Sequence, residues 1–273
     1  MDYSDSASQK KFRLGLALSG GGARGFAHAG AIAAIEEAGH KPDIIAGVSA
    51  GSIVGALYAS GVSPRQFMEL FANSKAKSFV DFKPHNGGMF SMVPFKKFIE
   101  KNIGKYRNLE ELPIPLYIGV TDFDHGVPCE FHSGPIGERV MASCSIPIAF
   151  TPVKIDGVTY VDGGVLRNHP AWIIRDKCDF LIGVNVSPLG EKLKGKADSI
   201  MSVALRTYNL MAKANQKADM DLCDLNIETQ EISHYRTFDL SNIEKVYNTG
   251  YANMRRALRK AGLWQKPLPE KQS

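Results

Sequence analysis

The stretch GLALSGGGARGFAHAGAI, residues 15–32, constrains the fold of this chain more than any other segment. Small apolar residues typical of a buried strand lead into three consecutive glycines, and a helical pattern follows them. Glycines at such a junction let the backbone turn sharply, and unpaired N–H groups at a helix N-terminus point at negative charge. The segment therefore predicts a strand–loop–helix unit whose loop binds either a phosphate or the oxyanion of an ester under attack.

The rest of the chain alternates in the same way between apolar runs and helical patterns. We expect strands at 14–19, 43–48, 115–123, 127–133 and 179–187, and a hairpin over 154–164. We expect helices over 23–39, 50–61, 135–145, 197–221 and 241–260, and one more that starts at Ser63-Pro64. This order predicts an α/β fold with a largely parallel sheet. No linker divides the chain, so we expect a single domain over 12–263 with loose termini at 1–11 and 264–273.

Composition restricts the class of protein. Of the 273 residues, 44% are hydrophobic and 22% charged, as in ordinary globular proteins. The net charge of +5 does not indicate a nucleic-acid partner. It is compatible with weak attraction to an anionic membrane, although a solvated surface with a slight lysine excess explains it more simply. The four cysteines include no C-x-x-C pair, and we expect them to be reduced, mostly buried thiols of a cytoplasmic protein.

The N-terminal sequence and the hydropathy pattern bear on membrane association. The first residues, MDYSDSASQKKFR, are polar and lack the apolar core of a signal peptide. No window approaches 18 continuous apolar residues, so we expect no membrane-spanning helix. If the substrate is a lipid, the protein has to visit the membrane from outside, as a peripheral and transient contact.

Two nucleotide-binding readings of the glycine loop can be compared with the residues downstream. Gly20, Gly22 and Gly25 match G-x-G-x-x-G between a strand and a helix, which is the context of a dinucleotide site. That site also needs an acidic residue at the end of the second strand, whereas Asp43 lies at its start. A phosphate-binding P-loop would need G-x-x-x-x-G-K-[ST], which is absent. A third reading, in which the glycines only pack a strand tightly against a helix, stays open.

The second predicted strand ends in GVSAG, residues 47–51, which matches G-x-S-x-G. Between a strand and a helix this pattern makes a nucleophile elbow, a sharp turn that exposes the serine hydroxyl above the sheet. Ser49 is the candidate nucleophile, because Ser52 lacks the flanking glycines and lies inside the helix. Since consecutive β-α units place neighbouring strand ends at one edge of a sheet, the glycine loop should lie beside Ser49 and offer it an oxyanion site.

A serine hydroxyl needs a base, and two kinds of base are candidates. A Ser-Asp-His triad fits poorly, because His169 follows Asp162 by only seven residues and only 48 residues precede Ser49. Asp162 itself, in TYVDGGVLRNHP, ends a strand-like run and could take the proton directly in a dry pocket. Spacing alone does not separate this role from that of an aspartate that organises a turn.

These segments together resemble the three signatures of the patatin-like phospholipase family: GGGARG at 20–25, GVSAG at 47–51 and DGG at 162–164. MASCSIPIAFTPV at 141–153 resembles the family's Ala-Ser…Pro block, and the NHP after the DGG fits its usual Asn-x-Pro. The resemblance covers residues 13–190 and extends only loosely to the C-terminal helices. The chain is most similar to the compact bacterial members, which lack large extra domains.

The resemblance implies a three-layer fold, with a central, mostly parallel sheet flanked by helices. It implies a Ser-Asp dyad of Ser49 as nucleophile and Asp162 as base, acting through an acyl-serine intermediate without metal or nucleotide. The oxyanion hole would come from three backbone amides, those of Gly20, Gly21 and Gly22. Arg24 would hold the loop or add positive field.

Residues 74–98 are irregular in pattern and rich in methionine and phenylalanine. We expect them to form a lip over an acyl pocket, with Met89 and Phe90 in contact with the substrate, since such side chains adapt to lipid chains. A loop pinned to the core by the same side chains is the alternative.

The leading hypothesis is a serine acyl hydrolase that cleaves the carboxylic esters of lipids. Three alternatives stay open: acyl transfer to an acceptor other than water, a nucleotide-binding module that uses the glycine loop, and a regulatory protein that kept the fold. They differ in whether Ser49 is reactive and in what the glycine loop binds.

Overall fold

The computed structural model describes residues 12–72, 88–188 and 199–269. The strands are β1 (Phe12–Leu18), β2 (Ile44–Val48), β3 (Gly88–Phe90), β4 (Leu116–Asp122), β5 (Val127–Phe131), β6 (Ile148–Phe150), β7 (Val153–Ile155), β8 (Val158–Asp162), β9 (Cys178–Asn185) and β10 (Leu225–Glu228). The α-helices are α1 (Phe26–Glu37), α2 (Ala50–Ala59), α3 (Pro64–Ala72), α4 (Val93–Asn102), α5 (Ile136–Ser143), α6 (Ala171–Ile174), α7 (Ile200–Ala214), α8 (Lys217–Met220) and α9 (Ile243–Lys260).

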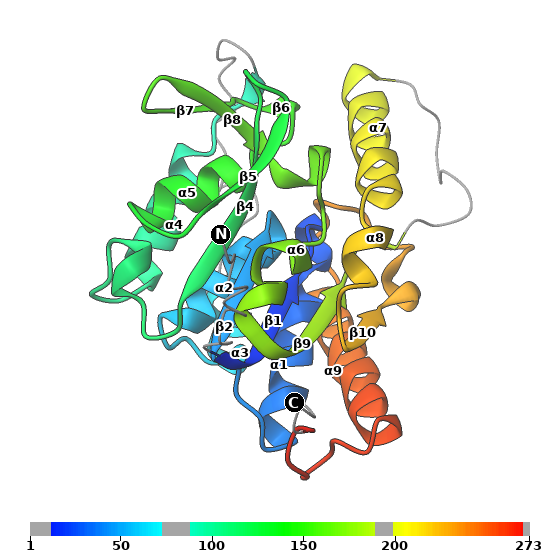
Figure 1. Ribbon diagram of the computed structural model, residues 1–273. Coiled ribbons are helices and arrows are strands. Elements are labelled where there is room, and N and C mark those ends of the chain that lie inside the picture. The colour runs from blue at the N-terminus through cyan, green and yellow to red at the C-terminus, as the bar shows by residue number, and fades with distance from the viewer. Residues whose placement is uncertain (1–11, 73–87, 189–198, 270–273) are drawn as a thin grey trace, which may run out of the picture.

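The described strands build one large sheet and one small one. The large sheet has the order β10-β9-β1-β2-β4-β8-β7, and β5 pairs with β4. The strands from β10 to β4 are parallel, whereas β5 and β8 each pair with β4 antiparallel, and β7 pairs with β8 antiparallel. The expected α/β fold with a central, mostly parallel sheet is confirmed (Figure 1).

Helices cover both faces of this sheet. The side chains of β1 alternate, so that Leu14, Leu16 and Leu18 enter the main core with α1, α2 and α9. Ala17 points the other way and joins a smaller cluster with Ala171 and Ile174 of α6. The parallel strands are therefore buried on both sides, which explains their continuous apolar runs (Figure 1).

Most predicted elements exist, with shifted ends. The hairpin is confirmed as β7 and β8, and its turn has φ of 50° at Asp156 and 90° at Gly157, as a two-residue turn of this kind requires. The helix expected from residue 23 begins with a 3-10 turn at Gly22–Gly25. The pattern over 197–221 is two helices, α7 and α8, and residues 197–198 lie outside the described ranges. Helix α4 and the short strands β3, β6 and β10 were not predicted from the sequence.

The C-terminal expectation needs a correction for residues 264–269. Leu268 is buried, and the guanidinium of Arg13 donates a hydrogen bond to its carbonyl at 3.3 Å. The Trp264 ring lies 5.0 Å from the guanidinium of Arg259. These contacts hold residues 264–269 against the domain, whereas their proline-rich, polar composition had predicted a loose terminus. Residues 1–11 and 270–273 lie outside the described ranges.

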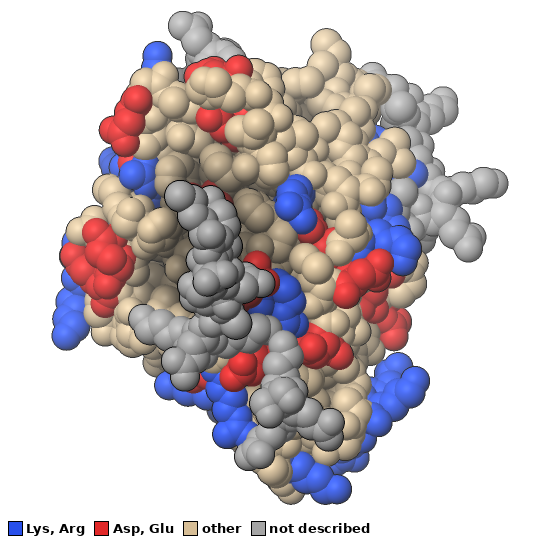
Figure 2. Space-filling model, in the orientation of Figure 1, with Lys and Arg blue, Asp and Glu red and all other residues tan. Residues whose placement is uncertain are grey.

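Three expectations from the sequence can be compared with the structure: buried cysteines, no membrane-spanning helix and a solvated surface. Cys144 and Cys178 are buried, but Cys129 and Cys223 are only half-buried, so fewer thiols are buried than expected. Within the described ranges, no helix combines the length and apolar character needed to cross a bilayer. On the face in Figure 2, acidic and basic side chains are intermixed, while the upper part of the surface over α7 carries few of either.

Candidate active site

Ser49 occupies a strained turn between β2 and α2. Its φ of 50° and ψ of −118° are unusual for a residue with a side chain. The turn is tight enough that a Cβ at Gly47 would lie 2.5 Å from the carbonyl oxygen of Gly51, and one at Gly51 would overlap the carbonyl oxygen of Leu18. Both glycines of G-x-S-x-G are therefore needed for space, as a nucleophile elbow requires.

The segment from Ser143 to Ser145 joins the elbow to the end of β8. The Ser143 hydroxyl accepts a hydrogen bond from the Ser49 amide at 2.9 Å and donates one to the carbonyl of Gly119 at 2.7 Å. The amide of Asp162 donates to the carbonyl of Ser145 at 3.0 Å. Because β4 pairs with β2 on one side and with β8 on the other, these bonds bring Ser49 and Asp162 to one end of the sheet.

Asp162 is fully buried at this end. Its Oδ1 accepts hydrogen bonds from the Gly164 amide at 2.8 Å and from the Tyr208 hydroxyl at 3.0 Å, whereas Oδ2 accepts none among the described groups. Burial raises the pKa of the carboxyl to about 6, against the opposing effect of the nearby Ser49 hydroxyl and of these two donors. One oxygen of the carboxylate is thus held by two donors, and the other accepts no hydrogen bond from a described group.

The glycine loop offers two amides rather than the three that we expected. The Gly20 amide donates to the carbonyl of Asn168 at 3.2 Å, and the Ala23 amide donates to the carbonyl of Thr237 at 2.6 Å. Among the described residues, the amides of Gly21 and Gly22 have no acceptor. Asn168, which follows Asp162 in the chain, accepts the hydrogen bond of the Gly20 amide. Gly20 is therefore no longer a candidate oxyanion donor.

Arg24 ties this loop to distant parts of the chain. Its buried guanidinium donates to the carbonyl of Gly21 at 3.3 Å, to that of Pro188 at 3.0 Å and to Oδ1 of Asn209 at 3.4 Å. Burial lowers its pKa to about 10. Of the two roles considered for Arg24, these contacts favour the one in which it holds the loop.

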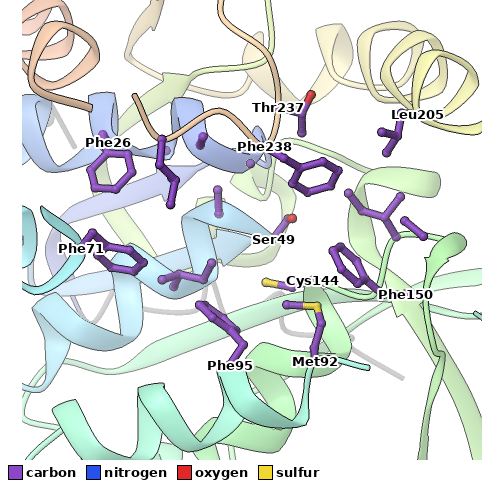
Figure 3. A pocket seen from close by; sticks show the side chains of 18 of the residues that line it. Phe26, Ser49, Phe71, Met92, Phe95, Cys144, Phe150, Leu205, Thr237 and Phe238 are labelled. Carbon is purple, nitrogen blue, oxygen red and sulfur yellow. The ribbon is translucent and has the colours of Figure 1, made fainter. Parts of the chain in front are cut away.

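An apolar pocket of about 360 Å³ opens around Ser49. In Figure 3 the hydroxyl lies between two groups of side chains, with Phe71 and Phe95 on one side and Phe150 and Phe238 on the other. The remaining lining residues are mostly apolar: Gly22, Ala23, Gly25, Phe26, Ala50, Ile53, Val54, Phe67, Phe90, Met92, Cys144, Ile146, Ala149, Met201, Leu205, Thr237 and Leu240. Such a pocket suits a hydrocarbon chain.

The expected lip is only partly described. Phe90 lines the pocket. Met89 is 46% exposed and does not line it, because alternate residues of β3 point in opposite directions. Residues 74–87 of the expected lip lie outside the described ranges, which resume at Gly88.

Neither the histidine triad nor the dinucleotide reading gains support from the geometry. His28 is buried with Nε2 2.8 Å from the carbonyl of Ser19, and burial lowers its pKa to about 4. His169 is buried without a hydrogen-bond partner in the described part, and burial lowers its pKa to about 3. No described histidine is hydrogen-bonded to Ser49 or Asp162. Asp43 accepts a hydrogen bond from the Leu14 amide at the opposite end of the strands from the loop.

Sequence reasoning missed several residues that hold the site. Ser143 lies in the 141–153 block and Asn168 in the NHP, so both had a signal in the motifs. Tyr208 and Asn215 had none, because they lie on a helix whose amphipathic pattern does not show which residue reaches a carboxylate.

In the ranges that the structure describes, no three His, Cys, Asp or Glu side chains are arranged to hold a metal ion.

Comparison with known families identifies the family of this chain. The family model described as patatin-like phospholipase matches residues 16–174, a segment that contains Ser49, Asp162 and the glycine loop. The chain belongs to the patatin-like phospholipase family. The family resemblance noted from the motifs is therefore confirmed.

Named relatives of this family are similar over part of their length. An uncharacterised NTE family protein of Mycobacterium tuberculosis is 30% identical over 205 residues, which are 74% of this chain and 56% of the relative. The mouse patatin-like phospholipase domain-containing protein 7 is 27% identical over 95% of this chain and 22% of its own length. The chain thus spans about half or less of these relatives.

Among solved structures, the fold is similar to that of VipD from Legionella pneumophila. The TM-score is 0.58 at 16% identity, over 92% of this chain and 67% of VipD. At this identity the likeness supports the patatin-like fold alone.

Proposed function

We propose that the protein is a serine acyl hydrolase that cleaves carboxylic esters of lipids, with Ser49 as nucleophile and Asp162 as base. The observation that carries this proposal is the Ser49 hydroxyl, which lies on a strained turn, lines an apolar pocket and is near a fully buried carboxyl group. Membership of the patatin-like phospholipase family supports the same class of substrate.

The reaction would run in two acyl-transfer steps. Asp162 takes the proton of the Ser49 hydroxyl as the oxygen attacks the ester carbonyl, and the amides of Gly21 and Gly22 stabilise the oxyanion. The tetrahedral intermediate collapses when the leaving alcohol receives the proton from Asp162, which leaves acyl-Ser49. Water then attacks this ester while Asp162 takes its proton, and the fatty acid leaves as Ser49 regains its hydrogen.

The raised pKa of Asp162 makes a carboxylate a better base than it is in water. With a pKa of about 6 the group is ionised at neutral pH, yet it binds a proton more readily than an exposed aspartate. This combination suits a residue that must accept a proton and return it within one turnover. Its cause is burial, so the dry pocket and the basicity of Asp162 depend on each other.

The surface around the pocket supports transient contact with a lipid surface. Phe238 lines the pocket and is 46% exposed, so it can meet an acyl chain before that chain enters. Exposed apolar side chains at a pocket opening are suited to an interface between water and lipid.

An activity panel with matched variants tests the proposal. Purified protein is assayed on p-nitrophenyl esters, lysophospholipids and phospholipids, beside Ser49→Ala, Asp162→Asn and the control Ser60→Ala, which removes a hydroxyl from the far end of α2. We expect both site variants to lose at least a thousandfold in kcat/KM and the control to lose nothing. Full activity in Ser49→Ala contradicts the proposal. Products measured with added alcohols separate hydrolysis from acyl transfer.

A further inference from the structure

Tyr208 reaches the candidate base from a distant part of the chain. It is one of two buried residues on α7, and its hydroxyl donates a 3.0 Å hydrogen bond to Oδ1 of Asp162. Oδ1 accepts two hydrogen bonds among the described groups, one from the Tyr208 hydroxyl and one from the Gly164 amide. Tyr208 does not line the pocket around Ser49, but its hydroxyl lies near enough to the Ser49 hydroxyl for Ser49 to affect the pKa of Tyr208.

The second glycine of DGG makes room for this hydroxyl. A Cβ at Gly164 would overlap the Tyr208 hydroxyl oxygen and would lie 2.8 Å from Oδ1 of Asn168. Gly163 serves another purpose, because a Cβ there would lie 2.7 Å from the carbonyl oxygen of Gly119. Gly163 thus allows close packing against strand β4, and Gly164 leaves space for the Tyr208 hydroxyl.

The C-terminal end of α7 fixes the rest of the loop that carries Asp162. The amide group of Asn215 donates to the carbonyls of Gly164 at 3.0 Å and Val165 at 3.2 Å. Its Oδ1 accepts from the Asn168 amide at 2.9 Å. Because Tyr208 and Asn215 lie two turns apart on one helix, α7 positions the hydroxyl and the loop as a unit.

We propose that Tyr208 is a positioning residue for the reaction: its hydroxyl holds Oδ1 of Asp162 and leaves Oδ2 to take the proton of Ser49. This inference rests on the proposed function. The hydroxyl also stabilises the ionised carboxylate, since a donor to Oδ1 opposes the rise in pKa that burial causes. A side chain that only filled space would affect stability and leave the acid–base behaviour of Asp162 unchanged.

The test is Tyr208→Phe, which keeps the ring and removes the donor. The control is Tyr58→Phe, since Tyr58 is also buried and its hydroxyl donates to a carboxylate, Oε1 of Glu36, at 2.9 Å, away from the pocket. Rates of ester hydrolysis and of Ser49 labelling by a fluorophosphonate are measured from pH 4 to 9. Circular dichroism checks the fold of each variant.

We expect Tyr208→Phe to lower kcat by about tenfold to a hundredfold with little change in KM. We also expect the acidic limb of both profiles to move to higher pH by about one unit, because the carboxylate loses a donor. Gly164→Ala, which displaces the same hydroxyl, should move the limb in the same direction. Tyr58→Phe should match the wild type.

The role of Tyr208 is overturned if Tyr208→Phe keeps the wild-type kcat and the wild-type acidic limb. If Ser49→Ala is inactive in the same experiment, the proposed function still stands. Activity that survives in Ser49→Ala overturns the proposed function itself. If Tyr208→Phe does not fold, Gly164→Ala decides by the same two measurements, and an unmoved limb there also overturns the inference.

Discussion

The two halves of the candidate site are held in place by different means. Ser49 is positioned by its own turn, in which Gly47 and Gly51 leave no space for a side chain and the backbone takes a φ of 50°. Asp162 is positioned by hydrogen bonds with residues far along the chain: its amide donates to the carbonyl of Ser145, and its carboxylate accepts from the hydroxyl of Tyr208. The nucleophile is thus held mainly by the sterics of its turn, with one further hydrogen bond from its amide to the distant Ser143 hydroxyl, whereas the base is held by hydrogen bonds with distant residues.

This difference predicts the largest effect at the elbow. Gly51→Ala places a Cβ against the carbonyl oxygen of Leu18, a backbone atom in the central strand that cannot move aside. We expect it to cost more than about 3 kcal/mol of unfolding free energy or to abolish soluble expression. Gly55→Ala on the same helix is the control, because its Cβ would meet only side chains, those of Leu116 and Ile45. Urea unfolding measures both, and equal stability of the two variants contradicts the steric account.

The base half predicts a smaller effect that depends on pH. The pKa of Asp162 rises from 3.8 to about 6 on folding, so its contribution to stability is fully present below pH 3.8 and is lost as the pH rises through 6. Asp162→Asn does not titrate. We therefore expect its stability relative to wild type to increase by roughly 2 kcal/mol between pH 4 and pH 8. Urea unfolding at both pH values measures this, and a difference that does not change with pH would show that Asp162 is not a buried, titrating group.

A second substitution in the elbow, Ser49→Gly, has the smallest expected effect on stability, and this effect does not depend on pH. Ser49→Gly relieves the positive φ, which costs a residue with a side chain about 1 kcal/mol or more. We expect a stability gain of about 1 kcal/mol at every pH, together with loss of activity. Ser60→Gly, at the C-terminal end of the same helix where φ is −80°, is the control and should lose stability. Thermal unfolding is the measurement, and a loss of stability in Ser49→Gly would show that the turn is not strained.

The same contrast explains which parts of the site the sequence predicted. The elbow could be predicted because its causes, a strand, two glycines and a helix, lie within a few residues of Ser49. Asp162 had two readings by spacing, and the family resemblance favoured one of them. Tyr208 could not be predicted, since it is 46 residues further on and nothing in an amphipathic helix shows which residue meets a carboxylate.

The oxyanion loop lies between these cases. The glycine pattern predicted where the loop is, and the structure places it at the start of α1 as expected. It could not show that the Gly20 amide is taken by the carbonyl of Asn168, because that contact depends on how the chain returns after Asp162. The fold class was predictable for a related reason: alternating apolar runs and helices limit the topology, whereas short edge strands such as β10, with one buried residue, leave little trace.

The most direct test of the central claim is the rate at which a fluorophosphonate labels Ser49 as the pH varies, read by mass spectrometry of the labelled peptide. The account predicts label on Ser49 alone, with a rate that rises through a pKa of about 6 in the wild type. In Asp162→Asn the rate should fall by at least a hundredfold and lose this pH dependence. Labelling of Asp162→Asn at the wild-type rate, or a label on another residue, would contradict it.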